Sequence, residues 1–290
     1  MKVMVGGTVD APELVNATRP ITLHDLLTHT AGFSNFESST SALPTTSSLI
    51  AAIRDRRNAH PETLRAMARE LAALPLQRQP GEAWIYGPST DLVGALIEAV
   101  SGQPFDQYLE QRVFRPLKMR DTGFEVAAEK RSRQVTFDAR QTDGSLKPVA
   151  PKPRGGAWPS GGGGLYSTPA DYVRFAQMLL NRGQLEGVRL LSPKTIELMT
   201  QDHLHGIPKP TKIYPVTDGF GYGVEIRTDL ARSQWLGTAG TFGWNGASTA
   251  YCGMDPKEGL IAMVWSQHSP NSEFELFERF NNLVYQALER

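Results

Sequence analysis

The hydrophobic pattern of the chain changes near Gly219, and this change constrains the fold more than any other feature. From about residue 22 to about residue 200, apolar side chains recur at the three- to four-residue spacing of helices. Beyond Gly219 they form short runs separated by turn residues, which is typical of strands. A closing helix is predicted from Ser272, and strands at 220–227, 233–237, 247–254 and 260–267. The sequence therefore predicts an α+β fold in which helices flank an antiparallel sheet.

We predict one domain over residues 1–290. The 290 residues are 40% hydrophobic, which is enough to bury a substantial core. Residues 20–218 would form a mostly helical region, and residues 219–290 the sheet and the C-terminal helix. Residues 126–158 are polar and basic with scattered Pro and Gly, and this composition predicts the short strands and loops of a lid or insertion.

The composition excludes several classes of function. Lys plus Arg and Asp plus Glu number 30 each, so no net charge draws the protein to nucleic acid or to an anionic membrane. A single cysteine, Cys252, excludes an internal disulfide and a cysteine-based zinc site. No apolar run has the length of a membrane span, and Met1–Gly7 is too short an apolar run for a signal peptide. We expect a cytoplasmic protein that acts on a small molecule without a cofactor or metal.

Helix start signals recur through the first two thirds of the chain. Thr22 and Asp25 form a Thr-x-x-Asp capping box ahead of an apolar segment. Two further helices are predicted at about 47–57 and 61–74, the second opened by Pro61 at its first position.

The stretch Trp84–Asp91 places a tyrosine where a short extended segment turns into a helix. Ser89 is predicted as the N-cap of that helix, whose inner face is predicted to carry Leu92, Val93, Leu96, Ile97 and Val100. Tyr86 can then be held rigidly with its hydroxyl directed out of the packed layer. Such a hydroxyl becomes chemically useful when a second group lowers its pKa or shares its proton. A purely structural tyrosine is the alternative.

Four segments together resemble the β-lactamase-related serine hydrolases, and especially the carboxylesterases and acyltransferases of that fold. In chain order they are Leu26–Gly32, Trp84–Asp91, Gly161–Gly164 and Gly240–Ala247. Each motif is weak alone, but their order from about residue 20 to the C-terminus matches the family. The resemblance implies a β-lactamase/transpeptidase-like fold and acyl transfer through a serine-bound intermediate.

The resemblance also assigns residues to roles. In the family, the lysine of a Ser-x-x-Lys helix shares protons with the tyrosine of a Tyr-x-Asn motif, and a Lys-Thr-Gly strand borders the acyl pocket. Tyr86 matches that tyrosine, and Trp244 begins the segment that stands where Lys-Thr-Gly would be. By the same match Gly246 borders the pocket and the Ala247 N–H is one of two oxyanion donors. Gly162 and Gly163 are predicted to contact substrate.

Two departures from the family pattern bear on function. No Ser-x-x-Lys occurs in the 290 residues, since Ser145 and Ser192 each have a lysine at the wrong spacing. The resemblance therefore predicts that the N-terminal strands and the nucleophile helix are missing, so the chain is expected to be truncated. Pro88 replaces the asparagine of Tyr-x-Asn, and Trp244 replaces a cationic lysine. Both changes remove partners for β-lactam or peptide substrates and favour neutral esters.

Three functions stay open at this point. The first is a serine carboxylesterase or acyltransferase without its N-terminal part, the second an inactive homologue or binding module, and the third a β-lactamase or D-amino-acid peptidase. His29 is a candidate general base, although backbone bonding is the commoner role in such a turn. His203 and His205 form a His-x-His pair with poor ligand geometry for a metal.

The predicted loss of the N-terminal strands also predicts that the protein associates with itself. An unpaired apolar edge of the sheet invites dimerisation or aggregation, unless residues 1–9 replace the missing edge strand.

Overall fold

The computed structural model describes residues 1–8, 10–33, 63–149, 158–208, 218–231, 235–271 and 273–288. The predicted helix at 47–57, the predicted helix start at Pro61 and the predicted start of the last helix at Ser272 lie outside these residues. The helices are α1 Leu23–Leu27, α3 Leu64–Ala72, α4 Ser89–Ser101, α5 Phe105–Leu109 with the π-helical turn Glu110–Phe114, α6 Pro169–Leu180, α7 Pro193–Met199 and α8 Leu276–Gln286, with 3-10 helices at Ala128–Arg133 and Glu273–Glu275.

The main sheet is an antiparallel meander of five strands. Its order is β11-β10-β9-β8-β7, so each strand pairs with its neighbour in sequence. The strands are β7 Asp218–Phe220, β8 Glu225–Arg227, β9 Phe242–Gly246, β10 Ala250–Asp255 and β11 Leu260–Trp265. This arrangement confirms the predicted α+β class with its antiparallel sheet.

Two predicted strands differ from the observed ones, and one observed strand was not predicted. The predicted strand 220–227 is two strands, because a turn at Gly221–Val224, with Gly223 at a φ of 75°, folds β7 back onto β8. The described part of the predicted strand 233–237 is irregular. Strand β9 was not predicted, since its glycines weaken the alternating apolar pattern that marks a strand.

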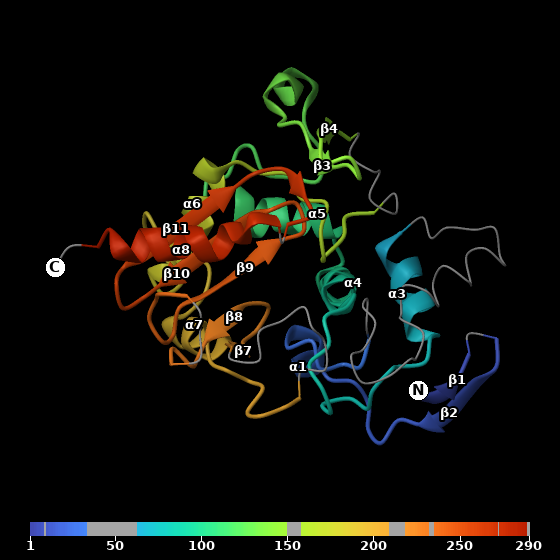
Figure 1. Cartoon of the computed structure of the whole chain (residues 1–290). Coiled ribbons are helices and arrows are strands. Elements are labelled where there is room, and N and C mark those ends of the chain that lie inside the picture. Colours follow the sequence, from blue (N-terminus) through green and yellow to red (C-terminus); the bar gives the residue numbers. More distant parts are fainter. Residues whose placement is uncertain are drawn as a thin grey trace.

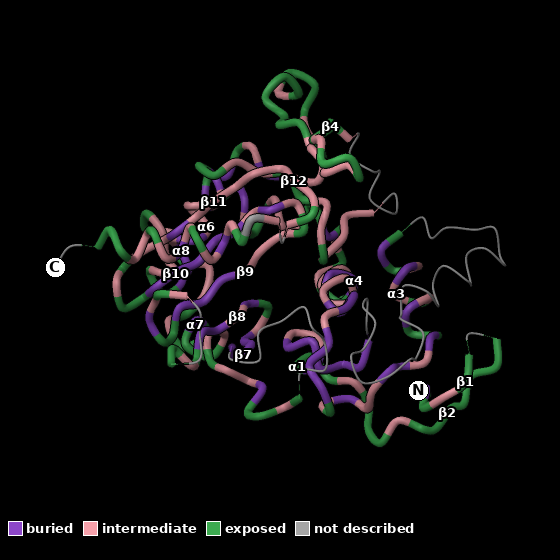
Figure 2. The backbone as a smooth tube through the Cα atoms, viewed as in Figure 1, coloured by how far each residue is buried: buried purple, intermediate pink, exposed green. Residues whose placement is uncertain are grey.

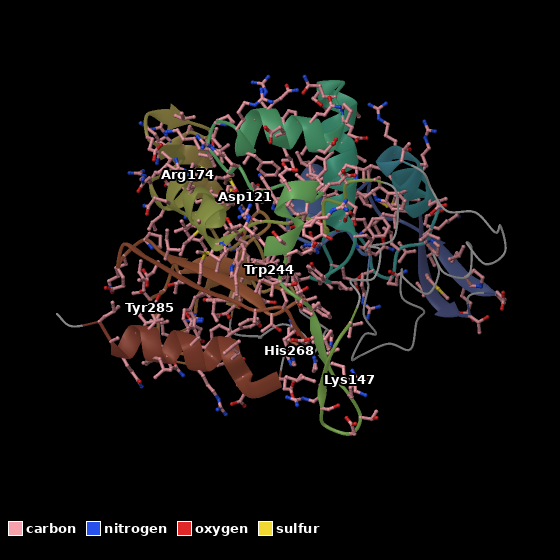
Figure 3. The ribbon with its side chains drawn as sticks, turned by 90° about the horizontal axis from the view of Figure 1, so that it is seen from above. Asp121, Lys147, Arg174, Trp244, His268 and Tyr285 are labelled. Atoms are coloured by element: carbon pink, nitrogen blue, oxygen red, sulfur yellow. The ribbon has the colours of Figure 1, made fainter. Side chains whose placement is uncertain are left out.

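Helices cover both faces of the sheet, as Figure 3 shows with α8 on one side and α6 on the other. On the α6 face, a core of buried side chains joins the sheet to α6 and α7; its members are Phe114, Leu117, Met119, Ala176, Met178, Leu179, Ile196, Val224, Ile226, Phe242, Cys252 and Met254. On the α8 face, Tyr251 stacks on Phe277 at 5.5 Å between ring centroids. Burial therefore concentrates around the sheet and along α1 and α4 (Figure 2).

Helix α4 differs in detail from its prediction. It begins at Ser89, and Pro88 occupies the N-cap without a side-chain hydrogen bond, so Ser89 as N-cap is wrong. Leu96 and Val100 are exposed. The buried face instead centres on Gly94 and Ala95, because a close approach of α3 and α5 admits only small side chains there. The helix ends at Gly102, which is left-handed at a φ of 70°.

The N-terminal segment does not join the main sheet. Strand β1 (Lys2–Gly7) forms a hairpin with β2 (Pro12–Asn16), at the opposite end of the molecule from β11 (Figure 1). Its inner edge bonds to Leu76 instead, since the Met4 N–H donates to the Leu76 carbonyl at 2.7 Å. The prediction that residues 1–9 replace a missing edge strand is therefore wrong. The outer edge of β11 pairs with no strand in the described residues, and association remains a prediction.

Within the predicted insertion, the described residues contain a 3-10 helix and a small hairpin. Strands β3 (Asp138–Arg140) and β4 (Leu146–Pro148) pair antiparallel, and β12 (His268–Ser269) adds to β3 in parallel. Short strands were predicted here, and they protrude from the body of the protein (Figure 1). Two short strands, β5 Gln184–Leu185 and β6 Val188–Arg189, follow α6. Among the described residues no helix has the length and apolar character needed to cross a membrane.

A buried carboxylate attaches α8 to the sheet. Asp255, at the end of β10, accepts hydrogen bonds from the Tyr285 hydroxyl at 2.7 Å and from the backbone N–H groups of Lys257 and Glu258 at 2.9 and 3.1 Å. The Thr238 hydroxyl donates to the same carboxylate. Because Asp255 is 1% exposed, each lost donor leaves charge without compensation.

We predict that Tyr285→Phe lowers the free energy of unfolding by about 1.5–3 kcal/mol, the typical contribution of a hydrogen bond to a charged group. Urea unfolding followed by circular dichroism measures it. Tyr108→Phe is the matched control, because no hydrogen bond involves the Tyr108 hydroxyl among the described residues. Equal stability of the two variants would contradict the role given to Tyr285.

Candidate active site

The site begins with a turn that follows α1 and is held by one carboxylate. Asp25 accepts two hydrogen bonds from the Arg19 guanidinium, at 2.6 and 2.8 Å, and closes the predicted capping box with Thr22. Its backbone carbonyl accepts from the Thr30 N–H at 2.9 Å. Burial alone would raise the pKa of Asp25, but the bonds from Arg19 and Thr22 outweigh it and lower the pKa to about 2. Asp25 therefore stays ionised and fixes the Thr28–Thr30 turn.

His29 lies in that turn, in a left-handed conformation with a φ of 55°. Its carbonyl accepts from the Ile85 N–H at 2.9 Å, directly before Tyr86. Its ring is 2% exposed, and Nδ1 has no hydrogen-bond partner among the described residues. Burial lowers the pKa of His29 to about 4, so the imidazole is neutral near pH 7. A neutral imidazole with so low a pKa is a poor general base.

Aromatic rings connect this turn to the sheet. The His29 ring lies 4.8 Å from the Tyr86 ring, centroid to centroid, and Tyr86 in turn stacks on Trp244 at 5.6 Å and 28°. Phe220, on β7, meets Trp244 edge to face at 5.4 Å. Trp84 is fully buried behind them. The structure thus brings Tyr86, from the helical region, against Trp244 on β9.

The glycine loop, residues 160–164, packs against the first turn of α4. The Ser160 hydroxyl donates to Asp91 Oδ1 at 2.5 Å, and the Gly162 N–H donates to the same oxygen at 3.3 Å. A Cβ atom on Gly161 would lie 2.1 Å from the Thr90 carbonyl oxygen, so only glycine fits there. Gly162 and Gly163 therefore border the start of the helix that Tyr86 precedes. Gly162 is exposed, and Gly163 is partly so.

Gly246 and Ala247 lie at the end of β9, in the turn that leads to β10. The Thr249 N–H donates to the Gly246 carbonyl at 3.0 Å and closes this turn, with Thr249 at a φ of 63°. Ala247 is exposed. Among the described residues no backbone acceptor takes its N–H. The Ala247 N–H can therefore donate to a ligand.

His203 and His205 do not form a metal site with other described residues. The His203 ring stacks on Tyr222 at 4.2 Å and bonds through Nε2 to the Leu198 carbonyl, and its ring lies 5.3 Å from that of His24. His205 is exposed. Among the described residues, no group of three or more His, Cys, Asp or Glu could hold a metal ion.

Sequence reasoning missed the roles of Asp91 and of the His29 ring. Asp91 enters the sequence analysis only as the end of the Trp84–Asp91 motif, whereas its carboxylate accepts hydrogen bonds from Ser160 and Gly162. A signal for both residues existed in their positions, since each lies within a motif of the candidate site. Neither contact follows from local sequence, because the partners of Asp91 lie about 70 residues away.

The fold and this arrangement of residues define a class of protein. A family model described as Beta-lactamase matches residues 11–286. Protein Rv1367c of Mycobacterium tuberculosis is 35% identical over 265 residues, covering 88% of this chain and 64% of that protein. Esterase EstB of Burkholderia gladioli is 30% identical over 261 residues, covering 81% of this chain and 62% of EstB. The simvastatin synthase LovD of Aspergillus terreus superposes with a TM-score of 0.74 at 26% identity, covering 100% of this chain and 75% of the synthase chain.

The chain belongs to the β-lactamase family, and its relatives include esterases and acyltransferases. This confirms the predicted resemblance. The chain spans less than two thirds of the length of Rv1367c and of EstB.

The buried imidazole of His29 makes the free energy of unfolding depend on pH. Because the pKa of His29 falls from 6.5 to about 4 on folding, the unfolded chain takes up this proton at a higher pH than the folded protein. Stability from this group is therefore complete above about pH 6.5 and is lost as the pH falls toward 4.

We predict that His29→Phe, which keeps an aromatic ring, reduces the loss of unfolding free energy between pH 7 and pH 5 by roughly 1–2 kcal/mol. Urea titrations at the two pH values measure this loss. The exposed His205 provides the control, as His205→Asn. An unchanged pH dependence in His29→Phe would refute the assignment.

Proposed function

We propose that this protein is a carboxylesterase that acts on neutral esters through an acyl-enzyme. The stacking of Tyr86 on Trp244 carries the proposal. It places a phenol and an indole side by side at the junction of the helical region and the sheet, where the family's tyrosine and its Lys-Thr-Gly segment meet. The esterases and acyltransferases among the relatives support the same class of reaction.

Trp244 favours an uncharged substrate. An indole provides apolar surface and one N–H donor, whereas a lysine would attract a carboxylate. The neighbouring side chains are aromatic as well, since Phe220 meets the indole and Trp84 lies behind Tyr86. An acyl group next to these rings loses contact with water, which stabilises an apolar chain and destabilises an anion.

The proposed roles follow the order of acyl transfer. A serine hydroxyl attacks the ester carbonyl, Tyr86 accepts its proton, and the Ala247 N–H donates to the oxyanion that forms. The ester C–O bond then breaks, the alcohol leaves with the proton from Tyr86, and the acyl group stays on the serine until water releases it. Gly162, Gly163 and Gly246 border the space that the acyl group occupies. Tyr86 acts as a base only beside a cation, because an unperturbed tyrosine has a pKa of about 10. The family supplies that cation as the lysine of Ser-x-x-Lys, and the 290 residues contain no such motif.

The absence of Ser-x-x-Lys supports a second candidate, in which the same surface binds an ester or acid without hydrolysing it. The two are separated by whether the reading frame upstream of Met1 encodes Ser-x-x-Lys. A β-lactamase or D-amino-acid peptidase is disfavoured by Pro88 and Trp244, which remove an amide and a cation from the acyl pocket.

We predict that the 290-residue chain hydrolyses p-nitrophenyl butyrate negligibly. A form that carries the upstream Ser-x-x-Lys should turn over, and Tyr86→Phe in that form should lower kcat by about 100-fold or more, the usual contribution of a general base. Tyr108→Phe in the same form is the matched control and should retain activity.

Two results would contradict the proposal. The first is stoichiometric labelling of the 290-residue chain by a serine-directed phosphonate with loss of turnover, because the nucleophile would then lie within these residues. The second is full activity of Tyr86→Phe in the form that carries Ser-x-x-Lys.

A further inference from the structure

The turn that carries Ala247 is held by a segment that follows β11. The Ser266 N–H donates to the Thr249 carbonyl at 3.0 Å, and the His268 N–H donates to the Ser248 carbonyl at 3.2 Å. In return, the Thr249 hydroxyl donates to the His268 carbonyl at 2.8 Å. The Asn271 amide reaches the Gly246 carbonyl at 3.4 Å. The turn therefore rests on residues 266–271 rather than on the sheet alone.

That segment is in turn attached to the β3–β4 hairpin. His268 and Ser269 form β12, which pairs with Asp138 and Ala139 of β3, and the Asp138 N–H donates to the Gln267 carbonyl at 2.9 Å. Figure 3 shows His268 beside this hairpin, whose other strand carries Lys147. Residues about 130 positions apart in the sequence thus form one small sheet at the edge of the site.

The side chains of Arg140, Glu273 and His268 bond to one another between the hairpin and the segment that follows β11. The Arg140 Nε donates to Glu273 Oε1 at 2.7 Å, and the other oxygen of that carboxylate meets the His268 ring. Their side chains are only 14–29% exposed, so solvent screens the cluster less than it screens a surface pair. Burial alone would raise the pKa of Glu273, but the bonds from Arg140 and His268 lower it overall. Glu273 therefore stays ionised between its two partners.

Arg140 also organises its own hairpin. Its Nη1 donates to the Gly144 carbonyl at 2.5 Å, while Nε bonds Glu273. Gly144 lies in the loop between β3 and β4, with a φ of 82°. One planar guanidinium thus bonds both Gly144 in the hairpin loop and Glu273, whose carboxylate contacts His268 of β12. A lysine ammonium keeps the charge but lacks the fixed geometry for both bonds.

We propose that Arg140 is a positioning residue, which acts through Glu273 and His268 to hold the Gly246–Thr249 turn and with it the Ala247 N–H. This inference rests on the proposed function, which explains why the position of the Ala247 N–H matters: an oxyanion donor must be held to within about 0.5 Å. Ala247 is exposed in this turn, whereas Thr249 is buried and left-handed, with its hydroxyl bonded to the His268 carbonyl.

Hydrogen exchange in the 290-residue chain tests this without any need for turnover. The reporters are the amides of Thr249, Ser266 and His268, each of which bonds within or onto the turn. In Arg140→Met we expect their exchange to accelerate by at least about tenfold. In this variant the local opening that allows exchange no longer has to break the contact between Arg140 and Glu273, so it costs less free energy. The amides of Trp244 and Cys252 in β9 and β10 should be unaffected, and the Tm nearly so.

Arg140→Lys should restore part of the protection, because it keeps the cation beside Glu273. Arg279→Met is the matched control, since Arg279 forms an exposed ion pair with Glu275 at 3.5 Å on α8 and should leave the turn unchanged. The Ala247 amide resonance should shift in Arg140→Met and not in the control.

The proposal is overturned if the turn amides keep their protection in Arg140→Met. It is also overturned if all amides accelerate together with a fall in Tm, because Arg140 would then act on the whole fold. Inactivity toward esters of the form that carries Ser-x-x-Lys would count against the proposed function and leave the exchange result in the 290-residue chain to decide the role of Arg140.

Discussion

Contact between the Tyr86 and Trp244 rings, 5.6 Å apart, joins two parts of the chain that the sequence keeps about 160 residues apart. Everything else at the site is arranged around this stack. His29 supports the tyrosine from the turn after α1, and Phe220 meets the tryptophan from β7. If either ring moved, the helical region and the sheet would lose this contact. The geometry of the site is therefore a property of the junction, and neither region forms it alone.

Carboxylates hold the elements around that junction, each by accepting two or more hydrogen bonds. Asp25 fixes the turn of His29, Asp91 holds the glycine loop against α4, and Asp255 attaches α8 to the sheet. Glu273 does the same for the segment behind the turn of Ala247. A buried carboxylate without donors destabilises a fold, whereas one whose oxygens accept hydrogen bonds specifies a single arrangement of the groups around it. These four positions explain why irregular loops can carry an ordered site.

Much of the fold follows from local sequence, because caps, glycine stops and alternating runs act over a few residues. The Thr22–Asp25 box, the stop at Gly102 and the antiparallel order of the sheet are such features. Pairing between distant segments does not follow from local sequence. Residues 1–9 were predicted at the edge of the main sheet, because any apolar strand can complete a sheet edge, but Lys2–Gly7 pairs with Pro12–Asn16 in a separate hairpin. At the site, motifs identified Tyr86 and Trp244. The support from His29, Asp91 and Arg140 depends on partners that only the folded chain brings near.

The central claim is that Tyr86, Trp244 and the Ala247 N–H bind one neutral carbonyl compound together. A titration by nuclear magnetic resonance with a methyl ketone, an analogue of an ester that cannot be hydrolysed, tests it in the 290-residue chain. We expect the Trp244 indole and the Ala247 amide to shift along one binding curve, and the carboxylate of the same chain length to bind at least about tenfold more weakly, because Trp244 stands where the family has a cationic lysine. A ketone that shifts neither group, or a carboxylate that binds more tightly, would contradict the account.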